Sequence, residues 1–311
     1  MTRDNLKNET GREAVESSIK HCYSTWGTSY YSDYYGPDAP YPPVHLDLVK
    51  RLVSERSVTR LLDAGCGPAS MLRHFVEPGR AVYGFDLTPE MVAEARRVLA
   101  DAGVASDHVW TGSVAAGADF VDPTGSADYD CILCSGVMPH IPEGIEQDVI
   151  ENIRGALKPG GYAIVEARNK LFSMFTLNRY SHEFYLKQLL PVDALQKQAG
   201  EERDGLKAAL AQVEGMFRTD LPPIRQGKET EPGYDEVLSR THNPLLLQQR
   251  FLASGFRDVQ LHYYHFHCLP PMVSGHAPRL FREVSLQMEN NSQDWRGLFM
   301  ASAFFVVAQR A

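Results

Sequence analysis

Short apolar runs alternate with amphipathic stretches through the first half of the chain. Segments 89–103 and 147–161 carry apolar residues at helical spacing. Between and around them, runs rich in Val, Ile and Leu predict buried strands at 58–65, 80–87, 128–136 and 160–167. Strands that alternate with helices are typical of a parallel sheet with crossover connections. Residues 56–168 therefore predict an α/β core with a Rossmann-like sheet, whose ligand lies beyond the carboxyl ends of the strands.

Three further segments surround this core. Residues 1–55 contain a tyrosine-dense stretch and an amphipathic pattern, which predict an aromatic-rich N-terminal cap and a first helix. Residues 169–243 predict an inserted helical lid or substrate-binding segment. One helix there would carry, at near-heptad spacing, Leu195, Ala199, Leu206, Leu210, Val213 and Phe217. That helix could equally be a dimer seam or pack on its own domain. Residues 244–311 predict a helix closed by Gly255 and two strands that complete the sheet.

Composition and charge narrow the class of protein. The chain has 31 basic and 39 acidic residues and a net charge of −8, which disfavours nucleic acid as a partner. No apolar run reaches the length of a membrane span, and the polar first residues lack the apolar stretch of a secretory signal. Five scattered cysteines suit a reducing compartment. We therefore expect a cytoplasmic protein that does not bind membranes.

Two patterns resemble metal sites but do not predict one. Cys131 and Cys134 form a CxxC inside a predicted strand, where residues three apart point to opposite faces. His265 and His267 share a strand face without a third ligand at suitable spacing. We expect no metal, and core packing or hydrogen bonding for all four side chains.

A glycine turn is the strongest local signal for chemistry. Asp63 ends a buried strand and is followed by Gly65 and Gly67, whose missing side chains allow a ligand to lie against the backbone. Asp86 follows the next strand, 19 residues after Gly67, where a carboxylate can accept both ribose hydroxyl hydrogens. It could instead cap the following helix. Alone, the turn could serve a nicotinamide dinucleotide, a flavin or no ligand, and Ser70 stands where a dinucleotide fingerprint needs a third glycine.

Five segments in order resemble the motifs of the class I S-adenosylmethionine-dependent methyltransferases. They are LLDAGCGPA, FDLTPEMVAEAR, TGSVAAGADF, YDCILCSGVMPHIP and ALKPGGYAIVEA. The resemblance implies a seven-stranded, mostly parallel sheet, S-adenosyl-L-methionine as cofactor and methyl transfer as the reaction. Ala69 stands where many members have a third glycine. A nicotinamide-dependent oxidoreductase remains the alternative, although Pro68 begins the segment where a pyrophosphate would bind and the next basic residue is Arg73.

The resemblance also implies the cofactor contacts. Asp63 would lie near the amino group of the methionine moiety, Asp86 would hold the ribose, and Leu87 and Met91 would flank the adenine. The predicted cofactor-binding residues are Tyr30, Asp63, Gly65, Cys66, Gly67, Asp86, Leu87, Met91, Gly112, Ser113, Val114, Ser135 and His140. The tyrosines around Tyr30 would form a flap over the cofactor or only pack the N-terminal segment on the sheet.

Methyl transfer is an in-line displacement, so the main task is to hold the acceptor atom against the methyl carbon in a dry pocket. A hydroxyl acceptor also needs a base. His140 and His242 are the candidates, His140 because it matches a histidine in the fourth motif. Both could instead be ordinary cap or turn residues. The predicted substrate-binding residues are Tyr31, Arg168, Asn169, Arg179, Tyr180 and His242.

The two arginines favour a polar, possibly anionic acceptor, unless they only make surface contacts. We expect O-methylation of a small molecule by a monomer or homodimer. N- or C-methylation is the alternative within the family, and a cofactor-binding scaffold without activity is a further one. The acidic charge disfavours a protein or RNA substrate.

Overall fold

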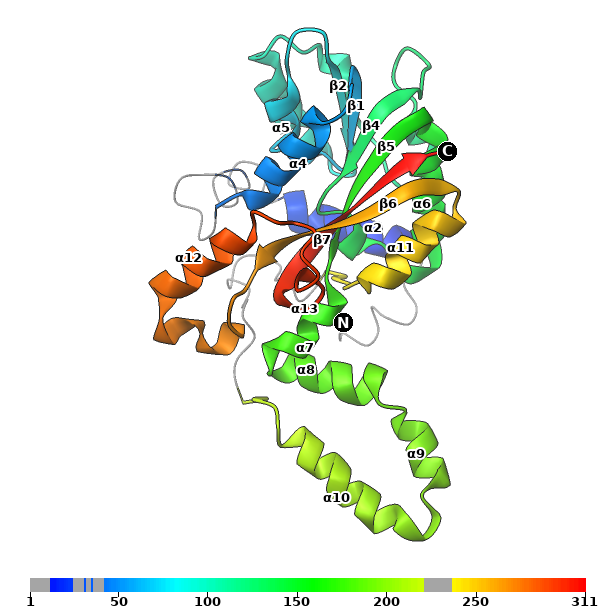
Figure 1. Cartoon of the computed structure of the whole chain (residues 1–311). Helices are drawn as coiled ribbons and strands as arrows, with labels where there is room; N and C mark the ends of the chain where they lie inside the picture. Colours follow the sequence, from blue (N-terminus) through cyan, green and yellow to red (C-terminus); the bar gives the residue numbers. More distant parts are fainter. Residues whose placement is uncertain (1–11, 25–30, 32–34, 36–41, 221–236) are drawn as a thin grey trace. The chain divides into compact units, whose positions relative to one another are not determined.

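A seven-stranded sheet forms the centre of the chain (Figure 1). The structure is a computed structural model that describes residues 12–24, 31, 35, 42–220 and 237–311. The strand order is β3-β2-β1-β4-β5-β7-β6. The first five strands pair in parallel, and β7 pairs antiparallel with β5. The strands are β1 Arg60–Ala64, β2 Ala81–Asp86, β3 Val109–Thr111, β4 Tyr129–Cys134, β5 Leu157–Arg168, β6 Phe256–Phe266 and β7 Ala301–Arg310. The predicted fold class is confirmed in its sheet.

The strand order places a switch point beside β1. From β1 the chain moves outward to β2 and β3, and it then returns to the other side with β4 and β5. Leu61, Leu62, Ile132 and Leu133 are almost completely buried, because a parallel sheet is covered on both faces. The loops that leave the carboxyl ends of β1 and β4 diverge at such a point, and ligands bind in the crevice between them.

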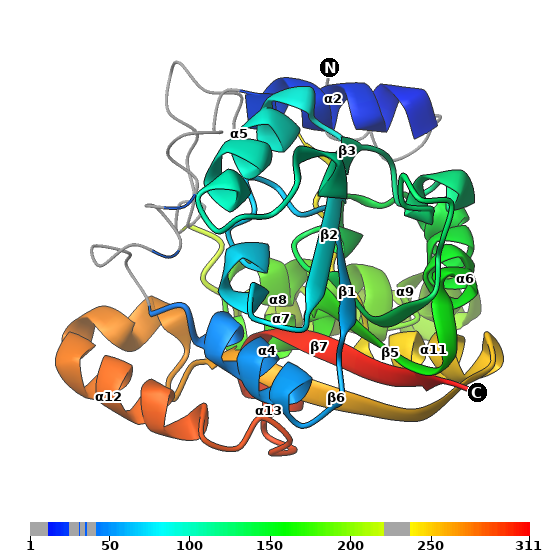
Figure 2. The ribbon, with the colours of Figure 1, turned by 90° about the horizontal axis from the view of Figure 1, so that it is seen from above.

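Amphipathic helices cover this sheet. In α5 the buried residues Met91, Val92, Ala95 and Leu99 recur at helical spacing, and Pro89 begins the helix where its missing N–H costs nothing. The helix α2 lies beside α5 (Figure 2). The helices of this part are α2 Arg12–Ser24, α4 Val44–Ser54, α5 Pro89–Ala100, α6 Glu146–Ala156 and α11 Pro244–Ala253, with 3-10 turns at Leu72–Phe75, Ser106–His108, Gly117–Phe120, Met138–His140 and Glu143–Ile145.

The described residues fall into two compact units. Unit 1 comprises residues 1–168, 225–262 and 303–311, and its second segment ends within β6. Unit 2 combines 169–224 with 263–302. Its elements are α7 Ser173–Thr176, α8 Arg179–Phe184, a π-helical turn Tyr185–Leu189, α9 Val192–Gln198, α10 Arg203–Glu214, α12 Pro278–Met288, α13 Gly297–Met300 and 3-10 turns at Lys170–Phe172, Gly200–Glu202 and Pro271–His276. The four-part division expected from the sequence stays a prediction.

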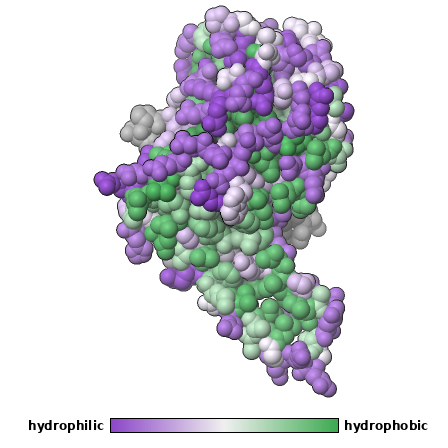
Figure 3. Space-filling model, in the orientation of Figure 1, coloured by the Kyte–Doolittle hydropathy of each residue, from purple (hydrophilic) through white to green (hydrophobic). Residues whose placement is uncertain are grey.

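The single long helix predicted across 195–217 is wrong. The chain forms two helices there, α9 and α10, because Gly200 adopts a left-handed backbone with φ +48° and the chain turns. Neither helix has a buried residue, and Leu195 is 40% exposed. Figure 3 shows the apolar residues of this hairpin on the surface. None of the helices in the described ranges is long and apolar enough to cross a membrane. Whether the hairpin is a lid stays a prediction.

The end of α11 and the strand cysteines agree with the sequence. Gly255 follows α11 with φ +83°, as a helix-closing glycine does. Cys131 and Cys134 are fully buried in β4, and burial raises the pKa of the Cys131 thiol to about 12. Among the residues that the structure describes, no three His, Cys, Asp or Glu side chains form a metal-binding group.

Candidate active site

The glycine turn after β1 holds the chain close to β2. The N–H groups of Gly65 and Cys66 donate to the Phe85 carbonyl at 2.8 and 2.9 Å. Gly65 has φ +87°, and a Cβ there would lie 2.2 Å from Val137 Cγ2. Gly67 has φ +51°, and no heavy atom lies within 4 Å of the position of its Cβ. The first glycine is required for packing against the next loop, whereas the space over the second is open to a ligand.

Ala69 carries the one departure from the family pattern in this turn. Its φ of +56° is a left-handed conformation that glycine adopts without strain and alanine rarely adopts. Its N–H donates to the Cys66 carbonyl at 3.0 Å, which closes the turn. The chain therefore keeps the glycine-type backbone at this position despite the methyl group.

Asp63 is the buried carboxyl of the site. It lies on β1 and is 2% exposed. Burial, and then the negative charge of Asp86, raise the pKa of Asp63 to about 7. A carboxylate in such surroundings gains most from a nearby cation. The position therefore suits an ammonium group on a ligand.

Asp86 ends β2 and accepts hydrogen bonds from the glycine turn and from the residue before α5. Its Oδ2 accepts the Gly67 N–H at 2.9 Å, and its Oδ1 accepts the Thr88 N–H at 2.9 Å. Burial raises the pKa of Asp86, and these two backbone hydrogen bonds oppose the rise. Each carboxylate oxygen can accept a second hydrogen bond. The residue thus orders the start of α5 and retains the capacity to accept ribose hydroxyls.

The loop after β3 is held by two acidic residues that the sequence reasoning missed. Asp119 Oδ2 accepts the Ser113 N–H at 2.8 Å, and Glu16 Oε1 on α2 accepts the Ser113 hydroxyl at 2.8 Å. Gly112 donates its N–H to the Asp86 carbonyl at 2.9 Å. An acidic residue in the TGSVAAGADF motif could have suggested Asp119, but Glu16 is brought in only by tertiary packing. The predicted neighbours of this loop lie in the same unit, Val114 and Met91 buried and Leu87 partly exposed.

Glu166 holds the loop after β4 through two hydrogen bonds. Its Oε2 accepts the Ser135 hydroxyl and, at 2.7 Å, the Gly136 N–H. Burial raises the pKa of Tyr35, and the charges of Glu166 and Asp63 raise it further, so Tyr35 lies close to both carboxylates. Ser135, one of the predicted cofactor-binding residues, is therefore positioned by a carboxylate on β5.

Tyr31 and Tyr35, in the N-terminal segment, form a stack. The rings of Tyr31 and Tyr35 are 5.5 Å apart and nearly parallel, and the Arg73 guanidinium lies 4.0 Å from the Tyr31 ring centroid. Arg73 also donates to the carbonyls of Ala69 and Pro68, each at 3.0 Å. The first basic residue after the glycine turn is thus engaged by backbone and ring, which does not suit a pyrophosphate. Tyr30 lies outside the described residues.

His140 lies in the loop after β4 and is buried. Its Nδ1 is 2.7 Å from the Leu238 carbonyl oxygen, and its Nε2 is 3.0 Å from the Tyr23 hydroxyl on α2. Burial lowers the pKa of His140 to about 4, while the Leu238 hydrogen bond opposes this and Arg168 lowers it further. The imidazole is therefore neutral at neutral pH.

His242 belongs to a buried charge cluster. Its Nε2 is 3.1 Å from Glu146 Oε2, and Arg240 and Arg250 donate to the same carboxylate at 2.9 and 2.6 Å. Burial acts to raise the pKa of Glu146, but the partners, His242 first, lower it to about 2. This cluster joins α6 to α11 and to the segment before α11. The role of His242 as a base or substrate contact stays a prediction.

The remaining substrate candidates are divided between the units. Arg168, at the end of β5 in unit 1, donates to the Ser239 hydroxyl and lies close enough to His140 to lower its pKa. Asn169, in unit 2, accepts the Leu171 N–H and donates to the carbonyls of α13 and Ala301 at 2.8 to 3.1 Å. These contacts give Asn169 a structural role. Arg179 and Tyr180, also in unit 2, begin α8, and Tyr180 is 37% exposed.

Comparison with known proteins assigns the central segment. Residues 62–163 match a family described as a methyltransferase domain. The chain is 30% identical over 167 residues to the ubiquinone biosynthesis O-methyltransferase of Xylella fastidiosa strain M23, covering 53% of this chain and 64% of that protein. It is 30% identical over 160 residues to the protein of that name from Xanthomonas axonopodis pv. citri strain 306, covering 50% and 63%. The chain thus spans less than two thirds of the length of these relatives.

A solved structure is also similar. Magnesium protoporphyrin IX methyltransferase from Synechocystis PCC 6803, with bound SAH, is 14% identical with a TM-score of 0.48, covering 95% of this chain and 99% of that one. The matched segment runs from within β1 to within β5, and the same sheet continues through the reversed β7 to Arg310. Sequence motifs, family match and strand order thus coincide on one sheet, and the family that matches residues 62–163 is that of a methyltransferase domain.

Proposed function

We propose that the protein transfers the methyl group of S-adenosylmethionine to a hydroxyl oxygen of a polar small molecule. The observation that carries the proposal is the pair Asp63 and Asp86, which end neighbouring parallel strands on either side of an open glycine turn. One carboxylate suits an ammonium group and the other a ribose diol, and the relatives named O-methyltransferases support oxygen as the acceptor atom.

The residues present fit the cofactor. The open position over Gly67 and the buried Asp63 would hold the methionine moiety, and Asp86 would hold the ribose. Leu87 and Met91 would flank the adenine, with its edge against the loop 112–114. When bound, the sulfonium supplies an electrophilic methyl carbon. The chain has to orient the acceptor, exclude water and accept a proton.

The first prediction concerns Asp86. Replacing Asp86 by Ala removes the predicted acceptors of both ribose hydroxyls, and charged hydrogen bonds contribute about 1.5 to 3 kcal/mol each. We expect S-adenosylhomocysteine to bind at least about 10-fold more weakly in calorimetric titration. Asp101→Ala, at the exposed end of α5, is the matched control and keeps the parental affinity.

A folded Asp86→Ala variant with undiminished affinity would contradict the proposed site. Thermal unfolding of the variant establishes folding, since Asp86 also accepts two backbone N–H groups. A parallel titration with a nicotinamide dinucleotide tests the alternative cofactor. Binding of that dinucleotide in place of S-adenosylhomocysteine would favour the oxidoreductase.

The second prediction concerns the acceptor. Arg168 ends β5 close enough to His140 to lower the pKa of that histidine, and there it would pair with an acidic group on the substrate. We expect the parent to methylate 3,4-dihydroxybenzoate with a lower KM than catechol, and Arg168→Ala to raise the KM for the carboxylated probe by about 10-fold. Ser239→Ala removes only the hydroxyl contact and serves as the control. An unchanged KM in Arg168→Ala would rule out this role.

A further inference from the structure

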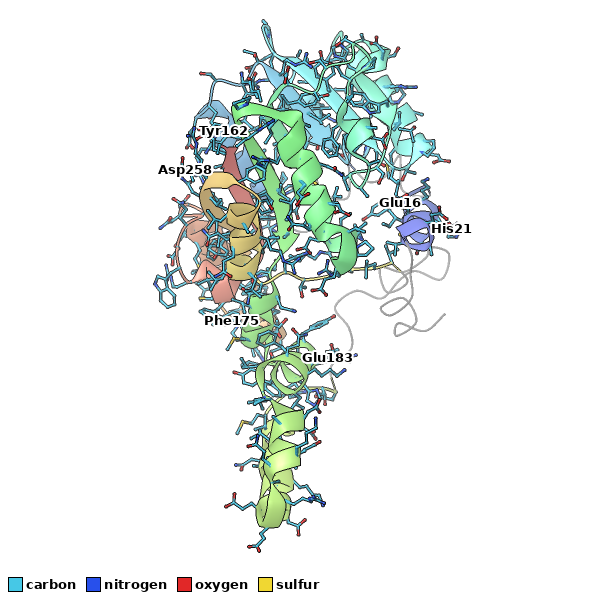
Figure 4. All side chains as sticks on the ribbon, turned by 90° about the vertical axis from the view of Figure 1, so that its right-hand side faces the viewer. Glu16, His21, Tyr162, Phe175, Glu183 and Asp258 are labelled. Atoms are coloured by element: carbon cyan, nitrogen blue, oxygen red, sulfur yellow. The ribbon has the colours of Figure 1, made fainter. Side chains whose placement is uncertain are left out.

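One face of α2 spans the carboxyl edge of the sheet. Val15 and Cys22, seven residues apart, are each 2% exposed. Beside them Glu16 and Tyr23, also seven apart, face the same way, because seven residues make almost two helical turns. Glu16 bonds Ser113 after β3, and Tyr23 bonds His140 after β4. Figure 4 shows Glu16 and the exposed His21 on this helix. The two contacts thus join α2 to loops that follow two different strands.

The hydrogen bonds determine the tautomer of His140. The Leu238 carbonyl can only accept, so the Nδ1 atom 2.7 Å away carries the ring proton. In a neutral ring Nε2 is then an acceptor, and the Tyr23 hydroxyl, 3.0 Å away, donates to it. Nε2 is the basic nitrogen of the ring, and it already accepts the Tyr23 hydroxyl. A proton from a substrate would therefore reach Nε2 through Tyr23.

Tyr23 is the better placed of the pair to meet a substrate. His140 is 5% exposed, whereas Tyr23 is partly exposed. A phenol that donates its proton keeps lone pairs on oxygen, with which it can accept a hydrogen bond from another hydroxyl. We propose that Tyr23 is a catalytic residue that accepts the proton of the acceptor hydroxyl and passes its own proton to His140. This rests on the proposed O-methyl transfer.

The proton transfer balances the charge of the reaction. The bond from sulfur to the methyl carbon breaks, its electron pair stays on sulfur, and the acceptor oxygen bonds to the methyl carbon. The hydroxyl proton moves to the Tyr23 oxygen, and the Tyr23 proton moves to His140 Nε2. The pocket loses the positive charge of the sulfonium and gains one on the imidazolium, so its net charge does not change. Release of that proton to water restores the neutral ring.

The charged neighbours of His140 are consistent with a transient imidazolium. Burial lowers the pKa of His140, the Arg168 guanidinium lowers it further, and the Glu166 carboxylate raises it. The ring is therefore neutral before transfer and gives up its proton readily afterwards. A tyrosine that only fastened α2 to the core would affect stability without affecting the proton requirement of the acceptor.

The experiment compares two phenols that differ in acidity. Tyr23→Phe removes the hydroxyl and keeps the ring. We expect kcat with catechol, which is un-ionised at pH 7.5, to fall by about 100-fold, as loss of general acid–base catalysis typically does. With 4-nitrophenol, which is largely ionised at that pH, the proton is already gone and we expect a change below about 3-fold. Tyr162→Phe, on β5 away from α2 in Figure 4, is the matched control.

Further readouts separate the possible failures. Binding of S-adenosylhomocysteine to Tyr23→Phe, expected at the parental affinity, tests the proposed function independently of the relay. Nitrogen-15 NMR of histidine-labelled parent protein should show His140 as the neutral Nδ1–H tautomer at pH 7, assigned with His140→Gln. An Nε2–H tautomer, or an equal loss of kcat with both phenols, would overturn the role of Tyr23 even if methyl transfer itself is confirmed.

If the parent methylates neither phenol, initial rates of adenosylhomocysteine formation with 3,4-dihydroxybenzoate at pH 6 and 9 replace the comparison. A loss in Tyr23→Phe that is as large at pH 9 would overturn the relay.

Discussion

Replacing Asp63 by Asn is expected to weaken cofactor binding and at the same time to stabilise the protein without ligand. The carboxyl of Asp63 is buried beside Asp86, and its pKa is raised to about 7. A raised carboxyl pKa means that ionisation disfavours the folded state, and the cost grows as the pH rises from about 4 to 7. The neutral amide of the variant has no such cost. We expect Asp63→Asn to be about 4 kcal/mol more stable than the parent at pH 8 and equally stable near pH 4.

The same substitution should have the opposite effect on cofactor affinity, which it should lower. The ionised carboxylate is the form that pairs with the ammonium of the methionine moiety, so the parent must lose a proton from Asp63 to bind. With a pKa of about 7 in the free protein, the affinity for S-adenosylhomocysteine should fall about 50-fold between pH 7 and pH 5. In Asp63→Asn the affinity is low at both pH values and nearly independent of pH. Calorimetric titration at the two pH values measures this.

An exposed aspartate provides the control for Asp63. Asp128 lies just before β4 and is exposed, so Asp128→Asn makes the same change of charge without relieving a buried carboxyl. We expect this variant to match the parent in urea unfolding at pH 8 and in cofactor affinity. Loss of stability in Asp63→Asn at pH 8 would mean that the carboxylate has a cationic partner within the protein, and the predicted contact with the ligand would then be wrong.

The other large effect is expected at Glu146. This side chain is 2% exposed and accepts hydrogen bonds from Arg240 and Arg250, with His242 at 3.1 Å. Glu146→Gln keeps the shape but leaves Arg240 and Arg250, whose side chains are 20% and 40% exposed, without their buried counter-charge. Removing one partner of a fully buried ion pair costs about 3 to 5 kcal/mol, and the partial exposure of both arginines places the cost at the lower end of that range. We expect a loss of that order in the free energy of unfolding at pH 7, measured by urea denaturation.

The pH dependence gives a second readout for Glu146. Its pKa is lowered to about 2, so the carboxylate contributes stability that is present above the ordinary glutamate pKa and is lost as the pH falls towards 2. The difference between parent and Glu146→Gln should therefore shrink between pH 4.5 and pH 2. Glu143→Gln is the control, because Glu143 is exposed and lies 3.8 and 4.0 Å from the same arginines. A loss as large in Glu143→Gln would contradict a specific role for burial.

The central sheet and its carboxylates were predictable because they depend on local pattern. Apolar runs such as 58–65 and 128–136 are dense enough to be buried on both faces, which only the inner strands of a parallel sheet require. The glycines at 65 and 67 likewise signal a backbone with positive φ. The helix across 195–217 failed for the same kind of reason. Its apolar spacing continued through Gly200, where the chain turns, and spacing alone does not register a break.

The amino-acid sequence alone thus determined the buried central strands, the glycine turn and the two aspartates, because each of these features depends on residues that are neighbours in sequence. Only the tertiary structure decided which distant groups complete the site. Glu16 bonds Ser113 and Tyr23 bonds His140, although about one hundred residues of sequence separate each pair. Glu166 on β5 bonds Ser135, which follows the neighbouring strand β4. No periodicity encodes such pairs, because they depend on where a helix of ordinary amphipathic pattern is placed after folding. The identity of a proton acceptor is a property of that placement.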